Sequence, residues 1–320
     1  MNAQRGQWSS RIGFVLAAAG SAIGLGNIWK FPFEVGNNGG AAFVVVYLLF
    51  CFILCFPVMV TEIAIGRKTN KNPVGAYKTL GFGKWSFVGM LGIFCGVLIL
   101  SFYNVVAAWA FGYFIEMITG NFAIGTQFGA FTSNWLKIGL YGMIFMGATA
   151  FIVSRGVSAG IERAAKILMP SLLGIMFFLV IYAFTLPNAM DGLTFYLVPD
   201  FSKLNLQVMY SALGQAFFSL SLGMGALITY GSYLSKRENI VSSAALITLA
   251  DVGIAFVAGL MMFPLVFSQG IEPNGGAGLI FVTLPGVFET LGPVLGIVIG
   301  TLFFMLLSFA ALTSTVSLLE

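Results

Sequence analysis

Charged residues are scarce in this 320-residue chain, and histidine is missing altogether. Only 8% of the residues are Asp, Glu, Lys or Arg, whereas soluble domains carry roughly 25%. Hydrophobic residues make up 59%, and the mean hydropathy is +0.98. The lack of histidine excludes histidine metal sites, histidine-based triads and histidine proton relays. The composition is therefore that of an integral membrane protein.

Cysteine is also rare, and Cys51, Cys55 and Cys95 all fall inside apolar segments. We expect free thiols that fill space in the core. The net charge of +4 is small, and the basic residues lie between apolar runs, so the sequence predicts no nucleic-acid partner. The apolar run from Ile12 follows a polar start and is predicted to remain as a helix rather than be cleaved as a signal peptide.

Long apolar runs dominate the rest of the chain. Runs of about 18 residues or more are candidates to cross a bilayer. We predict a single transmembrane domain, residues 1–320, with spans at about 11–36, 41–67, 87–119, 137–154, 160–185, 207–235, 240–268 and 293–320. The segment 276–291 is apolar but contains Pro285, which predicts a short re-entrant or extracellular helical segment.

Lysine and arginine are unevenly distributed between the two ends of these spans. With a cytoplasmic N-terminus, 12 of the 15 basic residues fall on the cytoplasmic side, and only Lys30, Lys137 and Lys203 fall outside. Short cytoplasmic loops of membrane proteins carry the excess of positive charge. We therefore predict a multi-pass protein of the plasma (inner) membrane, surrounded by membrane lipid.

The first apolar run has an irregular centre. Residues 17–33 read AAAGSAIGLGNIWKFPF, in which Gly20, Gly24 and Gly26 precede Asn27. Glycine is a poor helix former, and unwound backbone at membrane depth is tolerated only where it is buried in protein or lines a cavity. The stretch predicts a helix interruption whose free carbonyls can bind an alkali cation.

A second irregular run, GQAFFSLSLGMG at 214–225, lies five spans later, with Gly223 and Gly225 on either side of Met224. Two interrupted helices five spans apart indicate an inverted repeat, since an odd number of spans makes the second unit enter from the opposite side. The alternative is that both runs are glycine-rich packing seams, whose spacing Gly20 and Gly24 fit.

Seven segments occur in a characteristic order: WSSRIGFVLAAAGSAIGLGNIWKFPF, NNGGAAF, the region of Tyr103, MDGLTFYLVPDF, GQAFFSLSLGMG, GAGLIF and AALTS. Together they resemble the neurotransmitter:sodium symporter family, in its bacterial amino-acid branch. The resemblance implies an all-α integral membrane protein with an inverted five-helix repeat and broken helices one and six. Members have eleven or twelve spans, so the second repeat is expected to be incomplete in this chain.

The resemblance also implies two sodium sites. The first would involve Ala22, Asn27, Ser219 and Asp251, and the second Gly20, Ile23, Ala310, Thr313 and Ser314. Many relatives have Asn at the position of Asp251. Because an intramembrane acid is costly, we favour an ionised Asp251 that faces the cation, with a buried neutral acid as the alternative. For Thr313 and Ser314 the alternative is a hydroxyl bonded back to the preceding turn.

A substrate pocket follows from the same resemblance. Its members would be Ala22, Gly24, Gly26, Ile99, Tyr103, Phe218, Ser221, Met224, Ser314 and Leu318. Tyr103 would donate to the substrate carboxylate, and helix ends at the breaks would favour the same anion. Monoamine carriers have Asp at the position of Gly24, so Gly24 favours an amino acid. Ile99, Phe218, Met224 and Leu318 favour an apolar side chain.

Gating residues are implied at both ends. Arg5, Trp8, Ser232 and Tyr233 match the family's inner latch, and Lys30 stands where an outer Arg is usual. The acidic partners of Arg5 and Lys30 are expected after Glu320. Glu62 is expected to hold the unwound part of helix six. Because Ala107 replaces a second acid found in some relatives, we expect Glu62 to brace the backbone rather than share a proton.

Chloride is predicted to be unnecessary. Tyr47, Gln215 and Ser219 match the chloride site of animal relatives, and Ala255 stands where one bacterial type has a fixed Glu, but Asp251 itself can supply the charge. The sequence thus predicts sodium-coupled symport of a hydrophobic amino acid by alternating access, with two sodium ions and no enzymatic activity. The alternatives are a non-transporting amino-acid-binding protein or sensor on the same fold, or an inactive truncated fragment.

Overall fold

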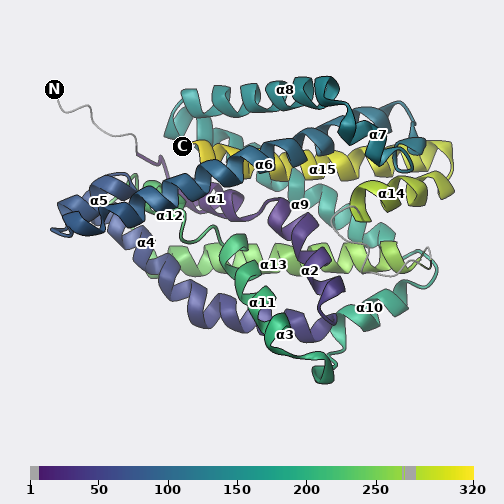
Figure 1. Ribbon diagram of the computed structural model, residues 1–320, viewed down its shortest axis with the longest axis horizontal. Helices are drawn as coiled ribbons and strands as arrows, with labels where there is room; N and C mark the ends of the chain where they lie inside the picture. The colour runs from purple at the N-terminus through teal and green to yellow at the C-terminus, as the bar shows by residue number, and fades with distance from the viewer. Residues whose placement is uncertain (1–6, 269, 271–278) are drawn as a thin grey trace.

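The computed structural model describes residues 7–268, 270 and 279–320, and every regular element among them is a helix. The long helices α6 (Ser86–Ile118), α13 (Ile240–Phe267) and α15 (Pro293–Leu319) lie along the long axis of the molecule in Figure 1. The other helices pack around them, and α15 makes its most extensive contact with α6.

Among the described residues, six helices are long and apolar enough to cross a membrane. They are Ala41–Thr69 (α3, Ala41–Phe50; η2, Cys51–Cys55; α4, Phe56–Thr69), Gly83–Ile118 (η3, Gly83–Trp85; α6), Trp135–Ser154 (α8), Val157–Ala183 (η5, Val157–Glu162; α9, Arg163–Ala183), α13 and α15. Each coincides with a predicted span to within a few residues.

The predicted span 11–36 corresponds to a bent pair of helices. The first half is α1 (Arg11–Ala22), and the second half, Gly26–Asn37, consists of the π-helical turn η1 (Gly26–Lys30) and α2 (Phe31–Asn37). The two halves meet at 47°. Counted as one crossing, this pair raises the number of spans in the described part of the chain to seven.

The predicted span 207–235 is also interrupted, within the segment 214–225 where the sequence predicts a break. It divides into α11 (Leu206–Ser219) and α12 (Ala226–Gly231), and neither piece is long enough to cross a membrane by itself. Ser221, Gly223 and Gly225 between them have φ values of 54°, 83° and 82°. This left-handed backbone does not fit a right-handed α-helix, and Gly223 and Gly225 adopt it at little cost because glycine has no Cβ.

Short elements connect the spans. They are α5 (Pro73–Thr79), η4 (Phe122–Ile124), α7 (Phe128–Ser133), α10 (Ala189–Leu197), η6 (Phe201–Lys203) and α14 (Leu279–Thr290). Helix α14 falls within the predicted segment 276–291, of which residues 276–278 lie outside the described residues. All three cysteines are free thiols; Cys51 and Cys55 are buried, and Cys95 is exposed.

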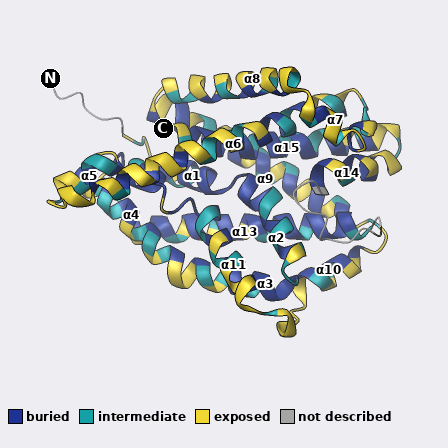
Figure 2. Cartoon of the chain, in the orientation of Figure 1, coloured by how far each residue is buried: buried dark blue, intermediate teal, exposed yellow. Residues whose placement is uncertain are grey.

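Burial distinguishes inner helices from outer ones (Figure 2). In α13 and α15 more than half of the best membrane window is buried, whereas in α8 only 17% is. The exposed faces remain apolar, with Phe94 60% and Met143 68% exposed. A soluble protein rarely exposes such continuous apolar surface, so these faces are suited to lipid. The buried helices α1, α13 and α15 carry several of the polar side chains described next, among them Ser21, Asp251 and Thr313.

Candidate functional site

The break in the first span exposes backbone groups that other helices satisfy. Ile23, the C-cap of α1, is extended at φ −75° and ψ 99°, so the carbonyls around it lose their helical partners. Thr313 Oγ1 donates to Ile23 O at 3.3 Å, and Ser314 Oγ donates to Ser21 O at 3.3 Å. Gln215 Nε2 donates to Gly26 O at 2.9 Å. The break is thus buried in protein, as unwound backbone at membrane depth must be.

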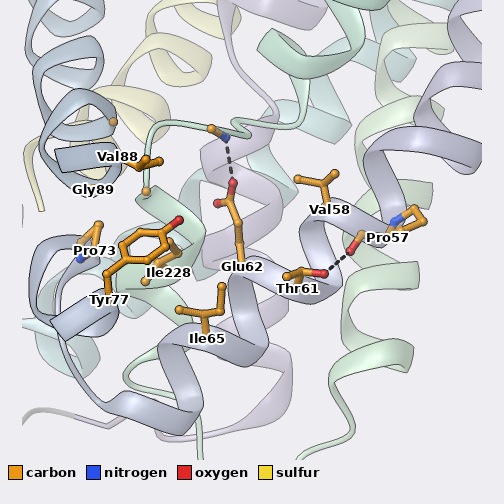
Figure 3. Close-up of a pocket in the computed structure, with 13 residues that line it drawn as sticks. Pro57, Val58, Thr61, Glu62, Ile65, Pro73, Tyr77, Val88, Gly89 and Ile228 are labelled. Atoms are coloured by element: carbon orange, nitrogen blue, oxygen red, sulfur yellow. Dashed lines mark hydrogen bonds between the residues drawn. The ribbon is translucent and has the colours of Figure 1, made fainter. Parts of the chain in front are cut away.

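The second break faces the first. Ser221 Oγ donates to Ser21 O at 3.2 Å, so the segment between α11 and α12 contacts the end of α1 directly. On its other side, Glu62 Oε1 accepts a hydrogen bond from Gly223 N at 2.8 Å. Figure 3 shows this side chain rising from α4 to reach the broken segment. This hydrogen bond satisfies the Gly223 N–H, which lies at the break and therefore has no helical partner.

A buried polar cluster joins the second half of the first span to α11 and α13. Asn27 Nδ2 donates to Asp251 Oδ1 at 2.7 Å, and Ser219 Oγ donates to Asp251 Oδ2 at 2.9 Å. Tyr47 OH adds a hydrogen bond to Asp251 Oδ2 at 3.4 Å and another to Ser219 Oγ at 3.2 Å. All four side chains are at most 1% exposed.

No Lys or Arg forms an ion pair with Asp251 within the part of the chain that the structure describes. A fully buried carboxylate is costly unless a cation or several hydrogen bonds compensate it. The donors around Asp251 are neutral side chains, so no charged partner is described for it. Of the residues predicted for the first sodium site, Ala22 lines a small cavity between the two breaks, while Asn27 and Ser219 each contact Asp251.

The residues predicted for the second sodium site also meet. Thr313 Oγ1 donates to Ala310 O at 3.0 Å as well as to Ile23 O. The Thr313 hydroxyl thus bonds back to its own helix and also contacts the broken helix, while the sodium site at this point stays a prediction. Gly20 lies close by, because a Cβ added there would come 3.5 Å from Thr313 Cβ.

A small central cavity lies between the two breaks. It encloses about 20 Å³ and is lined by Ser21, Ala22, Gly26, Ile99, Tyr103, Phe218, Ser221, Met224, Ser314 and Leu318. Nine of the ten predicted pocket residues are among these. The volume is enough for about one water molecule, so an amino acid requires the surrounding side chains to move apart.

Gly24 is the predicted pocket residue that does not line the cavity. A Cβ at Gly24 would come 2.5 Å from Tyr103 OH and would also overlap Ser314 Oγ. Gly24 therefore permits a close approach of two hydroxyls to the broken backbone. Tyr103 uses this approach, since its OH accepts a hydrogen bond from Leu25 N at 2.7 Å.

Ser21 lines the cavity without having been predicted. Its side chain donates to Ser317 Oγ at 2.7 Å. In the sequence, Ser21 stands out only as a serine within the glycine-rich stretch. Because an α-helical serine ordinarily bonds back to its own helix, its position does not by itself indicate a cavity.

At the end of the bundle predicted to face outward, Lys30 lies over the Phe218 ring, with Nζ 4.4 Å from the ring centroid. Its nearest acidic group is Glu34, one turn along the same helix, at 3.9 Å. Phe218 lines the central cavity, so Lys30 covers one of its walls from outside by a cation–π contact.

At the opposite end, which is predicted to be the inner one, Trp8 packs onto α12 and the residues that follow it. Trp8 Nε1 donates to Tyr230 O at 3.1 Å, and Trp8 N donates to Tyr233 O at 3.4 Å. Tyr233 OH donates to Glu320 Oε1 at 2.5 Å, and Ser232 Oγ donates to Thr229 O at 2.6 Å. Arg5, the remaining predicted latch residue, lies outside the described residues.

Sequence inspection missed Glu162 at this inner end. Glu162 accepts hydrogen bonds from Ser9 N at 2.8 Å and from Ser9 Oγ, and it pairs with Lys166 Nζ at 2.6 Å. Glu162 and Lys166 stand four residues apart, which is typical of an exposed helical pair. The N-terminal segment covers Glu162, which is only 1% exposed. The sequence does not reveal this burial.

The chemistry of these groups is that of cation and amino-acid binding. Carbonyl, hydroxyl, amide and carboxylate oxygens converge around the two breaks, and such oxygens suit hard cations. Among the described residues no group of three or more His, Cys, Asp or Glu could hold a metal ion together. The arrangement therefore provides the weakly charged, oxygen-rich surroundings that suit an alkali ion better than a transition metal.

Known proteins are similar to this chain in sequence and in fold. Residues 5–135 and 129–320 match the profile of the Sodium:neurotransmitter symporter family. The uncharacterized sodium-dependent transporter YhdH of Bacillus subtilis is 42% identical over 325 residues, covering 98% of this chain and 71% of the relative. An uncharacterized sodium-dependent transporter of Haemophilus influenzae is 39% identical, covering 100% of this chain and 73% of the relative.

Among solved structures, the crystal structure of MhsT in complex with L-phenylalanine superimposes with a TM-score of 0.92 at 47% sequence identity. The match covers 99% of this chain and 73% of the MhsT chain.

Proposed function

Since the chain belongs to the sodium:neurotransmitter symporter family, a family of sodium-dependent membrane transporters, we propose that it is part of a symporter that couples sodium entry to the uptake of a hydrophobic amino acid. The observation that carries the proposal is the pair of helix breaks, which meet around one cavity and bring oxygen-rich side chains to both sides of it. Discontinuous helices of this kind form the substrate and ion sites of transporters.

The first sodium ion is proposed to bind between Asn27, Ser219 and Asp251, with the Ala22 carbonyl and the substrate carboxylate completing its shell. The support is that Asn27 and Ser219 both hydrogen-bond to Asp251, which has no basic partner among the described residues. A buried carboxylate and a monovalent cation compensate each other at close range.

The second sodium ion is proposed to bind between the carbonyls of Gly20, Ile23 and Ala310 and the hydroxyls of Thr313 and Ser314. The support is that Thr313 Oγ1 already bridges two of these carbonyls. An ion there would tie the end of α1 to α15, so that sodium binding closes the inner side of the site.

The substrate is proposed to be an amino acid with an apolar side chain. The MhsT structure contains L-phenylalanine, and the cavity of this chain is walled by Ile99, Phe218, Met224 and Leu318. Met224 can adopt several rotamers, so that a range of apolar side chains can be accommodated. Tyr103 OH and the N–H groups of the break are proposed to bind the carboxylate.

Chloride is proposed to be unnecessary, because the Asp251 carboxylate lies against Tyr47 and Ser219. These two hydroxyls point at Asp251 and would otherwise be free to donate to an anion. A fixed carboxylate at this point supplies the negative charge that a bound chloride would supply.

Alternating access is proposed to follow from an inverted repeat whose two broken helices move together. Lys30 over Phe218 would restrict the outer path, and Trp8 on Tyr230 and Tyr233 the inner path. Glu62 would keep the second break attached to α4 during this motion.

Uptake of labelled L-phenylalanine into proteoliposomes tests the proposal. An inward sodium gradient should drive accumulation, and replacement of Na⁺ by K⁺ or choline should abolish it. Equal uptake in all three media would contradict sodium coupling. Sodium-dependent binding without uptake would favour the non-transporting binding protein over the symporter.

A further inference from the structure

Three buried serines connect the end of α1 to α15 through a closed ring of hydrogen bonds. Ser21 Oγ donates to Ser317 Oγ at 2.7 Å, and Ser317 Oγ donates to Ser314 O at 2.9 Å. Ser314 Oγ donates back to Ser21 O at 3.3 Å, which completes the ring. We call these three residues the serine ring. Their exposed fractions lie between 4% and 6%, so water competes little for these bonds.

The serine ring lies beside the residues proposed for the second sodium ion. On α1, Ser21 stands between the proposed ligands Gly20 and Ile23. On α15, Ser314 is itself a proposed ligand, and its neighbour Thr313 donates through Oγ1 to Ile23 O at 3.3 Å. The serine ring and the proposed sodium shell therefore join the same two segments of the chain.

The Ser21–Ser317 bond differs from the Thr313 contact in its relation to the ion. Thr313 Oγ1 and Ile23 O both belong to the proposed sodium shell, so the proton between them must turn away when both oxygens face the cation. Neither Ser21 Oγ nor Ser317 Oγ is a proposed ligand. Their bond therefore joins α1 to α15 both before and after sodium binds.

The direction of the Ser21 hydroxyl is set by tertiary packing. A serine on an α-helix ordinarily donates to a carbonyl of its own preceding turn. Ser308 on α15 does so, with Oγ 2.8 Å from Phe304 O and 7% of the residue exposed. Ser21 instead donates across to α15, where Ser317 accepts its proton and gives its own proton to Ser314 O. The pair is thus an interhelical link, and Ser308 is a serine of similar burial that bonds within its own helix.

Such a link matters because the end of α1 lacks helical support. Ile23 is extended at φ −75° and ψ 99°, so the backbone leaves the helix soon after Ser21. An ion whose ligands lie on two separate segments loses affinity to the cost of ordering those segments. A bond that already holds the segments together removes part of that cost. Sodium affinity at the second site is therefore expected to depend on Ser21 and Ser317, although the ion contacts neither hydroxyl.

We propose that Ser21 and Ser317 are positioning residues of the second sodium site. Their hydroxyl pair holds the broken end of α1 against α15 before the ion arrives, and this preorganisation sets the sodium affinity. The inference rests on the proposed function, because it takes sodium to bind between α1 and α15. Loss of either hydroxyl weakens sodium binding without removing a ligand of the ion.

The direct test measures the sodium concentration that gives half-maximal binding of L-phenylalanine, with choline as replacement. Ser317→Ala should raise this concentration at least threefold, because the Ser21 hydroxyl loses its acceptor on α15. Ser21→Ala should raise it by a similar factor, because the donor is lost. The fold should persist in Ser317→Ala, since the Ser21 hydroxyl can then bond back to its own helix. Unchanged sodium dependence in either variant would overturn the proposal.

The double variant Ser21→Ala/Ser317→Ala shows whether the two hydroxyls act as a pair. Both single substitutions break the same bond, so the double variant should match either of them, whereas two independent effects would multiply and contradict the pair. Ser308→Ala is the matched control, because it removes a serine of similar burial from the same helix. It should bind sodium as the wild type does. A shift equal to that of Ser317→Ala would contradict the assignment.

A merely structural role of the pair gives a different result. It lowers the thermal midpoint in choline and leaves the sodium dependence of binding unchanged, and this outcome would overturn the positioning role.

The proposed function can fail separately. A wild-type protein that binds no L-phenylalanine would contradict the proposed substrate. The rise of the thermal midpoint with sodium, measured without amino acid, then decides the inference with the same variants. A wild-type midpoint that does not respond to sodium would contradict the second sodium site and, with it, this inference.

Discussion

Asp251 is the side chain on which the proposed ion chemistry depends most. It is fully buried, accepts hydrogen bonds from Asn27, Ser219 and Tyr47, and has no basic partner among the described residues. Replacement by Asn removes the anion that a cation needs and turns one of the two accepting oxygens into an NH2 donor.

We predict that Asp251→Asn lowers the affinity for L-phenylalanine at least tenfold in chloride-free sodium buffer, and that added chloride restores part of it. The physical reason is that chloride can replace the lost negative charge between Tyr47 and Ser219. Equilibrium binding in sodium chloride and sodium gluconate checks this. A chloride requirement in the wild-type protein would contradict the proposed role of Asp251.

Gly24 provides a test of close packing at the first break. We predict that Gly24→Ala lowers the thermal midpoint and weakens L-phenylalanine binding, because the added Cβ would overlap Ser314 Oγ and Tyr103 OH. Overpacking of this kind costs about 1–3 kcal/mol. Thermal unfolding in detergent, followed by tryptophan fluorescence, measures the effect.

The matched control is Gly214→Ala on α11, where an added Cβ meets nothing within 4 Å. It should leave the midpoint unchanged or raise it, since alanine favours a helix over glycine by about 0.5–1 kcal/mol. Equal destabilisation by both substitutions would show that Gly24 is not packed as described.

Much of the site could be predicted from residue types, and some of it could not. The polar residues in apolar spans, above all Asn27, Asp251 and Glu62, stand out because buried polar groups are expensive. Ser21 and Glu162 did not stand out, because a serine or a Glu–Lys pair on a helix normally has a local explanation. Their contacts with Ser317 and Ser9 depend on tertiary packing.

Interrupted helices are the elements that bring these side chains together. The sequence predicted both interruptions from their glycines, and the structure locates the first at Ile23 and the second at Ser221–Gly225. Hydropathy alone delimits 207–235 as one apolar range, because it does not register the positive φ angles at which the structure divides that range. The π-helical turns at Gly26–Lys30 and Cys51–Cys55 were likewise invisible, since their residues are ordinary helix residues.

The left-handed backbone at the second break predicts which of two glycine substitutions destabilises the protein more. Gly223→Ala should destabilise the protein by about 1–2 kcal/mol, the cost of left-handed backbone for an L-residue. Gly225→Ala should cost more, because its Cβ would also come 2.5 Å from Pro73 Cγ. Thermal midpoints in one detergent give the order, and a reversed order would contradict the described geometry.

The inner latch can be tested through Glu162. We predict that Glu162→Gln accelerates amide hydrogen exchange in residues 7–12, because Ser9 N and Ser9 Oγ both donate to the Glu162 carboxylate. Charged acceptors form stronger hydrogen bonds than neutral amides. Exchange of this segment in Glu116→Gln should match the wild type, and unchanged exchange in Glu162→Gln would show that the latch is held elsewhere.

The arrangement of the complete bundle follows from burial and charge. Seven of the eight predicted spans correspond to helices or a bent pair that can cross a membrane, because long apolar runs are an unambiguous signal. Which helices form the centre could not be predicted, since α8 and α13 are similarly apolar but differ greatly in burial. Orientation stays a prediction from the distribution of Lys and Arg.

Orientation can be measured with single cysteines in a Cys95→Ala background. Lys84 and Gln127 are both exposed and lie beyond opposite ends of α6. We predict that an impermeant maleimide added to intact cells labels Gln127→Cys and not Lys84→Cys, because Lys84 belongs to the basic, cytoplasmic side. The reverse labelling would invert the topology.

The central claim is that the two helix breaks form one sodium-dependent amino-acid site. Equilibrium binding of L-phenylalanine to the purified protein, as a function of sodium concentration with choline as replacement, tests it most directly. The account predicts no measurable binding in choline and a steep rise with sodium, with a Hill coefficient clearly above one because two ions bind with the substrate. Binding of equal affinity in sodium and in choline would contradict it.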